Sequence, residues 1–160
     1  MLQLLGTLLL LLASCSISGP LRVDRSATTY FFPEAPAGWE KKIPQDGAEY
    51  FYQHKSSGAV LSVSSLCDRY EESKLEILAR SALDPVESQK DIESKTYILD
   101  GREAFEVYVE GKLDGVPVQV DYVSWRKDDC LFDFSIQAAP KISSKVREEF
   151  HSMLKKFHYK

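Results

Sequence analysis

Residues 100–138 read DGREAFEVYVEGKLDGVPVQVDYVSWRKDDCLFDFSIQA, and this stretch decides the fold. Apolar and polar side chains alternate along it in three runs, which is typical of antiparallel strands. The runs are separated by Asp-Gly at 114–115 and by Lys127, Asp128 and Asp129. Another Asp-Gly pair, at 100–101, precedes the first run, and such pairs favour tight hairpins because both residues tolerate positive φ. The sequence therefore predicts an antiparallel meander of four strands over residues 94–138.

Residues before the meander predict a hairpin and a helix. Residues 48–55 and 59–66 are rich in β-forming side chains and flank the turn Ser56-Ser57-Gly58. Asp68, with Glu71 three residues later, has the pattern of a helix N-cap, and Pro85 ends the helix. An amphipathic helix of about four turns is expected between them. Its apolar stripe comprises Leu75, Leu78, Ala79, Ala82 and Leu83.

A second helix is expected after Pro140, which ends the meander. Ser143 or Ser144 can cap it. Its apolar stripe comprises Val146, Phe150, Met153, Leu154 and Phe157. The predicted order is β-β-α-β-β-β-β-α, which favours one α+β domain with a single antiparallel sheet of about six strands flanked by helices.

The N-terminal residues 2–13 are almost wholly apolar. This run is shorter than the roughly 20 residues of a membrane span and fits the apolar region of a signal peptide. Leu12, Ala13, Ser14 and Cys15 then resemble the lipobox of bacterial lipoproteins. The resemblance implies cleavage before Cys15 and attachment of a diacylglycerol to its thiol and a fatty acid such as palmitate to its amine. An ordinary secretory signal with a chance cysteine is the alternative.

This leader divides the chain into a signal peptide (1–14), a tether (15–28) and a domain (29–160). The tether contains Ser, Gly and Pro with few apolar groups. Ser16 stands where an aspartate retains many lipoproteins in the inner membrane. By that analogy the expected location is the outer membrane of the cell envelope, with the domain facing the periplasm.

Two cysteines remain after Cys15, namely Cys67 and Cys130. Side chains alternate between the two faces of a strand, and each cysteine shares a face with apolar residues of its own strand. Both cysteines are therefore expected to face the core. A compartment outside the cytoplasm permits a disulfide, which would close a loop of about 60 residues and stabilise the fold by about 4 kcal/mol. Two buried, unpaired thiols are the other interpretation.

Three stretches resemble the PsbP-like α/β/α sandwich: YFFPEAPAGWEKK at 30–42, the meander, and FHSMLKKFHYK at 150–160. That superfamily includes the extrinsic PsbP subunit of photosystem II. The resemblance implies a small adaptor that docks on a larger assembly at a membrane, and it assigns no site residue to this chain. Tyr30, Phe31, Phe32 and Trp39 are the candidate contact with a partner, the alternative being that they pack on their own domain.

Few residues carry a catalytic or metal-binding pattern. His151 and His158 lie seven apart, whereas metal-binding pairs on a helix favour a spacing of four, so no metal site is expected. His54 lies near a turn and is expected to be solvated. The adjacent Asp128 and Asp129 lack the spaced pattern of a calcium loop. Carboxylates that could meet in space, as acid–base enzymes require, are Glu71, Glu72, Glu103 and Glu106.

The formal net charge of −4 argues against a nucleic-acid partner, which requires a basic face. The sequence favours a membrane-anchored, non-catalytic binding or adaptor module with no cofactor, whose partner is another envelope protein. A carrier of a small apolar ligand between sheet and helix is the first alternative. A hydrolase with a scattered site is the second.

Overall fold

The computed structural model describes residues 30–44, 47–67 and 73–160. The predicted signal peptide, Cys15, the tether, and Asp68, Glu71 and Glu72 lie outside this part of the chain. No helix among the described residues is long and apolar enough to cross a membrane.

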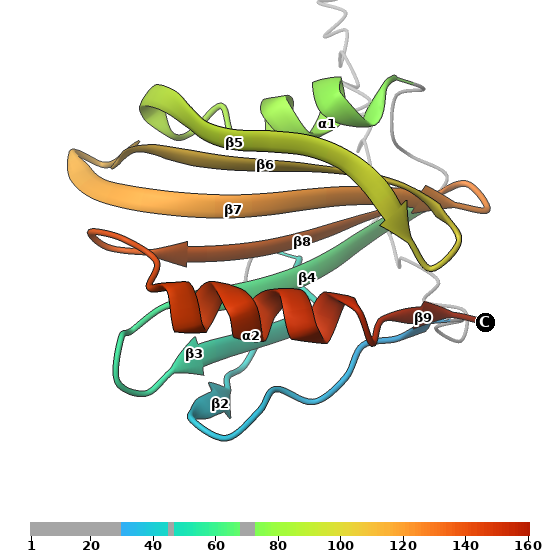
Figure 1. The fold of residues 1–160 in the computed structure, drawn as a ribbon, viewed down its shortest axis with the longest axis horizontal. Helices are drawn as coiled ribbons and strands as arrows, with labels where there is room; N and C mark the ends of the chain where they lie inside the picture. The colour runs from blue at the N-terminus through green and yellow to red at the C-terminus, as the bar shows by residue number, and fades with distance from the viewer. Residues whose placement is uncertain (1–29, 45–46, 68–72) are drawn as a thin grey trace, which may run out of the picture.

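The described residues form a seven-stranded antiparallel sheet (Figure 1), and the predicted α+β fold is confirmed. Its strand order is β2-β3-β4-β8-β7-β6-β5. The sheet strands are β2 (Trp39–Lys41), β3 (Tyr50–His54), β4 (Val60–Cys67), β5 (Glu87–Leu99), β6 (Arg102–Leu113), β7 (Val116–Lys127) and β8 (Cys130–Ala138). The two helices are α1 (Leu75–Ala82) and α2 (Ser144–Leu154). A separate two-stranded sheet joins β1 (Tyr30–Phe31) to β9 (His158–Tyr159) near the C-terminus.

The hairpins of the meander form where the sequence predicts them. Asp100 and Gly101 have φ values of 44° and 76°, and Asp114 and Gly115 have 50° and 78°. Such backbone angles match the twist of the flanking strands, so β5, β6 and β7 follow each other as neighbours.

The two helices cover opposite faces of the sheet. Leu75 and Ala79 of α1 pack with Phe105, Val107 and Val109 of β6. The other face carries the larger core, in which α2 packs on Trp125, on the aromatic residues of β8 and on residues of β1 and β9. Because side chains alternate along a strand, one parity of each central strand faces α1 and the other faces α2. Each face of the sheet thus has its own buried core under a helix.

Three elements differ from the prediction. β5 begins at Glu87 rather than near residue 94. Its first half is an exposed edge with many charged side chains, so the sequence there lacks the apolar alternation that predicts a strand. α1 has eight residues rather than four turns. The backbone of Lys74 is extended, with ψ of 143°, so the helix begins at Leu75 and Asp68 is not its N-cap. β2 also adds a short edge strand within the proline-rich segment.

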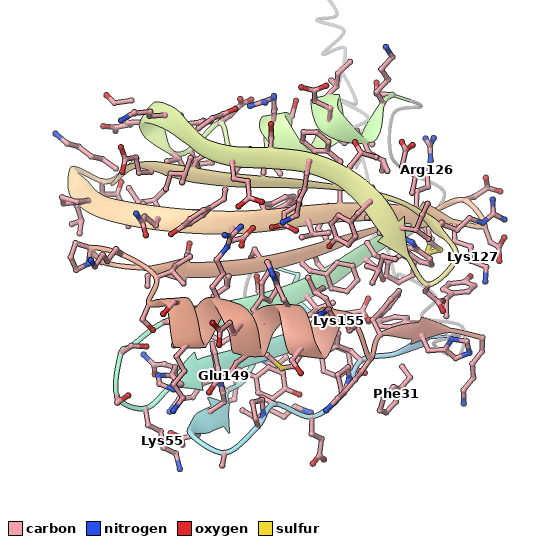
Figure 2. The ribbon with its side chains drawn as sticks, in the orientation of Figure 1. Phe31, Lys55, Arg126, Lys127, Glu149 and Lys155 are labelled. Atoms are coloured by element: carbon pink, nitrogen blue, oxygen red, sulfur yellow. A yellow bond between two sulfur atoms is a disulfide. The ribbon has the colours of Figure 1, made fainter. Side chains whose placement is uncertain are left out.

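The aromatic segment at 30–39 packs into the domain. Tyr30, Phe32 and Trp39 are 7%, 3% and 8% exposed, while Phe31 is 52% exposed. Pairing of β1 with β9 places the Tyr30 ring against Phe132, and Trp39 Nε1 donates to Glu149 Oε2 at 2.8 Å. The prediction of a four-residue contact surface is therefore wrong for the three buried members, because their rings complete the core. Phe31 alone of the four offers its ring to solvent (Figure 2).

A disulfide joins Cys67 to Cys130. The two residues are opposite each other and form the terminal pair of the β4–β8 ladder. Cys67 is exposed, so the expectation that it faces the core is wrong, whereas Cys130 is half-buried and packs against the larger core. Their place at the end of the ladder leaves them at the rim of the sheet.

Candidate functional site

A buried ion cluster lies between the sheet and α2. Glu106 on β6 and Asp121 on β7 are 2% and 0% exposed. Arg147 and His151 lie one turn apart on α2 and face them. Arg147 Nε donates to Asp121 Oδ2 at 2.6 Å, and its Nη2 donates to Glu106 Oε1 at 3.0 Å. His151 Nε2 lies 3.2 Å from Glu106 Oε1 and 3.3 Å from Asp121 Oδ2.

Side chains of β5 extend this cluster toward the edge of the sheet. Arg147 Nη1 donates to Glu93 Oε2 at 3.0 Å, and Lys95 Nζ lies 2.8 Å from Glu93 and 3.3 Å from Glu106. The guanidinium of Arg147 lies 4.3 Å from the centroid of the Tyr108 ring, which supports it as a cation–π contact. The three carboxylates and the cations Arg147 and Lys95 balance when His151 is also protonated.

The pKa values within the cluster favour this balanced state. Hydrogen bonds to Asp121 and Glu106 raise the pKa of His151 to about 9. Burial opposes ionisation of Glu106, but the hydrogen bond and charge of His151, together with Lys95, lower the pKa of Glu106 to about 2. Near neutral pH His151 is therefore a cation and Glu106 an anion, so neither is poised to act as a general base or acid.

Glu106, Asp121 and His151 also have the composition of a metal site, since one ligand atom from each lies within 4.8 Å of the others. Asp121 Oδ1 is buried without a hydrogen-bond partner among the described residues. A metal would have to displace the proton from His151 and would lie beside the Arg147 guanidinium. Ion pairing with Arg147 and His151 therefore explains the cluster better than metal coordination does.

A cavity of about 340 Å³ opens beside the cluster, between β5 and the C-terminal end of α2. Tyr97 and Leu99 from β5 and Leu154 from α2 give it apolar walls. Lys95, His151 and Lys155 contribute cations to its lining, and Glu106 and Asp100 contribute carboxylates. Figure 2 shows Lys155 at the end of α2, below the point where β5 curves toward the helix. Burial, together with the charges of Glu106 and Asp121, raises the pKa of Tyr97, so its hydroxyl stays protonated.

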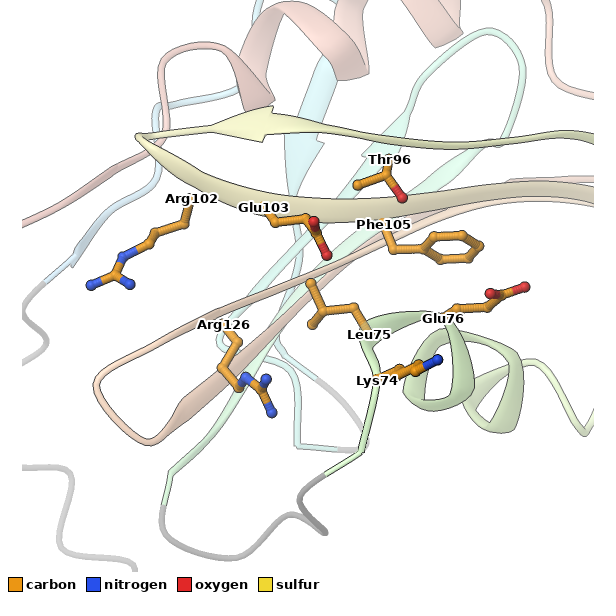
Figure 3. Close-up of a pocket in the computed structure, with 8 residues that line it drawn as sticks. All are labelled: Lys74, Leu75, Glu76, Thr96, Arg102, Glu103, Phe105 and Arg126. Atoms are coloured by element: carbon orange, nitrogen blue, oxygen red, sulfur yellow. The ribbon is translucent and has the colours of Figure 1, made fainter.

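A second cavity, of about 490 Å³, lies on the α1 face (Figure 3). Lys74, Arg102 and Arg126 line it together with Glu76 and Glu103, around the apolar Leu75 and Phe105. Arg126 Nη1 donates to the carbonyl of Ser73 at 3.3 Å. Glu103 therefore faces this cavity while Glu106 faces α2, so strand parity separates two of the four carboxylates that could have met in space.

The other histidines do not join the cluster. His54 is 8% exposed, packs edge-on against Trp39 and pairs with the Ser57 hydroxyl at 2.8 Å. The expectation that His54 is solvated is wrong, because the β3–β4 turn folds its hydroxyls back onto the ring. His158 is exposed and pairs with Asp100 at 2.9 Å.

Sequence reasoning missed Arg147 and Asp121 as site residues. The spacing of residues in the sequence could have indicated both. Arg147 and His151 are spaced four apart on the helix, and Glu106 and Asp121 share the polar parity of neighbouring strands. The sequence did not show that α2 covers the face of the sheet to which Glu106 and Asp121 point.

No family model and no curated protein matches the chain. Several solved structures are similar to it. LpqN of Mycobacterium tuberculosis, described as involved in cell envelope biogenesis, aligns with a TM-score of 0.56 at 11% identity over 86% of each chain. The Ran-binding protein Mog1p of Saccharomyces cerevisiae gives 0.55 at 15%, over 78% of this chain and 87% of its own. Cyanobacterial PsbP from Synechocystis gives 0.53 at 12%, over 82% and 87%. These likenesses show a PsbP-like fold, as expected from the sequence, and the low identities carry no function.

Proposed function

We propose that this chain is a lipid-anchored, non-catalytic binding module of a bacterial cell envelope. The observation that carries this proposal is the ion cluster under α2. Its carboxylates and its histidine are bound to Arg147, to Lys95 and to one another, in protonation states that favour pairing over proton transfer. The ion cluster thus holds α2 on the sheet, and a partner would bind to the surface of the domain around the cluster.

The anchor in this proposal is a lipid on Cys15, which the lipobox supports. About 15 residues separate Cys15 from β1, and a flexible chain of that length spans roughly 20 Å on average. The domain would therefore stay close to the membrane and meet partners there at a raised effective concentration. The envelope context of LpqN is consistent with this placement.

The experiment is affinity capture of the full-length chain from detergent-solubilised native membranes, beside a Cys15→Ala variant. We expect the wild type to carry lipid and to retain one stoichiometric protein partner. The variant should stay unprocessed and lose both. Recovery of wild-type chain with an unmodified Cys15, or with no partner, would contradict the proposal.

A carrier of a small apolar ligand is the second candidate, because the cavity beside α2 lies between sheet and helix, where such a ligand would bind. Lys155 beside the apolar walls fits an amphiphilic anion better than a wholly apolar molecule, since Lys95 and His151 are already paired with carboxylates. Native mass spectrometry of protein purified from native membranes separates the two functions. A bound small molecule in place of a protein partner would favour the carrier.

A further inference from the structure

The outer edge of β5 is unpaired among the described residues, since β5 ends the strand order. Its two halves differ. The bulges of the β5–β6 ladder lie between Glu87 and Glu93, and the register is regular from Glu93 to Leu99. Bulges and charges are common protections of an exposed edge, and here both bulges lie in the first half, whereas residues 94–99 hold one charged side chain, Lys95. The second half curves toward α2 but has no bulge, and Ile98 within it is 70% exposed.

Hairpin geometry identifies the backbone groups on this edge. Leu99 and Arg102 close a two-residue hairpin, so Leu99 exchanges both backbone hydrogen bonds with β6. The pattern alternates along an antiparallel ladder, so Tyr97 and Lys95 also bond to β6. The backbone N–H and C=O groups of Ser94, Thr96 and Ile98 point outward instead and are available to another strand.

The cavity beside α2 lies along the same half of β5. Lys95, Tyr97 and Leu99 contribute to it from β5, and Leu154 and Lys155 from α2. A strand added at the edge would place every second side chain over this cavity, because side chains alternate between faces. The backbone N–H of Lys155 caps α2, and its ammonium group has no hydrogen-bond or ion-pair partner among the described residues, so its charge is available to a bound group.

We propose that β5 binds an extended peptide segment of an envelope protein, which adds to residues 94–98 as an antiparallel strand. Every second side chain of that segment is apolar or acidic and enters the cavity between β5 and α2. The side chains between them face solvent. The acidic side chains pair with Lys155 at the rim. The proposal rests on the proposed binding function and specifies the site and the kind of partner.

Charge favours this occupant over a second copy of the chain. Lys95 and His151 are already paired with Glu93, Glu106 and Asp121, so Lys155 is the cation of the cavity that a bound group can neutralise. Two copies joined through this edge would bring their two Lys155 side chains onto one face, where they would repel, whereas an acidic peptide side chain would neutralise Lys155. Main-chain bonds would supply affinity, and the cavity would supply specificity.

The direct test uses a fluorescent nonapeptide of sequence Thr-Leu-Thr-Glu-Thr-Leu-Thr-Glu-Thr, with the full-length chain in detergent micelles. Opposite residues of an antiparallel ladder share a face and a bonding direction, so the Thr amides would bond to β5 while Leu and Glu face the cavity. N-methylation of the Thr residues should abolish binding. N-methylation of the Leu and Glu residues should leave it unchanged. Equal affinity of the two methylated peptides, or no saturable binding of the parent peptide, would overturn the proposal.

A matched pair of variants tests the protein side. Thr96→Pro removes one outward N–H without removing a bond to β6, and Thr96→Val keeps that N–H. Thr96→Pro should weaken peptide binding about tenfold, the value of one hydrogen bond, and Thr96→Val should leave the affinity unchanged. Should Thr96→Pro fail to fold, hydrogen exchange in the wild type decides. The peptide must slow exchange at Thr96 and Ile98, and unchanged exchange there contradicts the proposal.

Two further results separate this proposal from its alternatives. A full-length chain that sediments as a dimer, and as a monomer when Thr96→Pro is introduced, would assign the edge to a second copy and overturn the peptide. A lipidated chain that retains its partner after Thr96→Pro would overturn this site while leaving the proposed function standing. An unmodified Cys15 would contradict the proposed function whatever the peptide does.

Discussion

Replacing His151 with glutamine removes the cation that completes the charge balance under α2. The pKa of His151 is about 9 in the folded chain, against an ordinary value of about 6.5 when unfolded. At 1.36 kcal/mol per pH unit, the difference corresponds to at most about 3.4 kcal/mol. The His151 side chain is 29% exposed, so solvent screening reduces the expected contribution to about 2 kcal/mol.

The sign of the effect follows from the direction of the pKa change. Because folding raises the pKa of His151, its stabilisation is complete below about pH 6.5 and is lost as the pH rises through 9. The free energy of unfolding of the wild type should therefore fall by about 2 kcal/mol more than that of His151→Gln between pH 6 and pH 9.5.

Urea denaturation of both proteins across this range measures the difference directly. His158→Gln is the matched control, because His158 is largely exposed and lies outside the cluster. Parallel curves for wild type and His151→Gln would refute the reasoning, since they would show that the ion cluster does not hold the proton on His151.

Four further outcomes follow from the packing and charge of the domain. Arg147→Ala leaves Glu106 and Asp121 buried beside fewer cations and should lower the free energy of unfolding by about 3 kcal/mol. Arg80→Ala, at an exposed pair with Asp91, should cost less than about 1 kcal/mol in the same urea titration. The residues of the Cys67–Cys130 disulfide are 63 apart in the chain, and reducing this bond should lower the free energy of unfolding by about 4 kcal/mol. Urea titrations with and without reductant measure this loss. A loss below about 1 kcal/mol would show that the disulfide constrains the unfolded chain little. Phe32→Ala should cost about 3–4 kcal/mol and Phe31→Ala less than about 0.5 kcal/mol, and equal losses in thermal denaturation would contradict their assigned burial.

The meander was predictable because its signals are local. Asp-Gly pairs fix hairpins within a few residues, and alternation fixes which side chains share a face. The same alternation could not say that a helix covers the polar face, since that depends on α2, which follows the meander in the chain. Glu106 and Asp121 therefore resemble surface residues in the sequence and lie buried in the structure.

Contacts between distant segments account for the other errors. Tyr30 and Phe32 belong to the core because β1 pairs with β9 at the opposite end of the chain. Arg147 meets Asp121 across 26 residues, and no local pattern encodes that distance. His54 ends β3 beside a turn whose own sequence suggests solvent, and Trp39 on the neighbouring strand covers it. In each case the sequence does not predict which distant segment packs against the residue.

The most direct test of the central claim is native mass spectrometry of the chain extracted from its own membranes. The account predicts a species that lacks residues 1–14, carries lipid on Cys15 and is bound to one copy of a second protein. A chain with an unmodified Cys15 and no bound protein would contradict it.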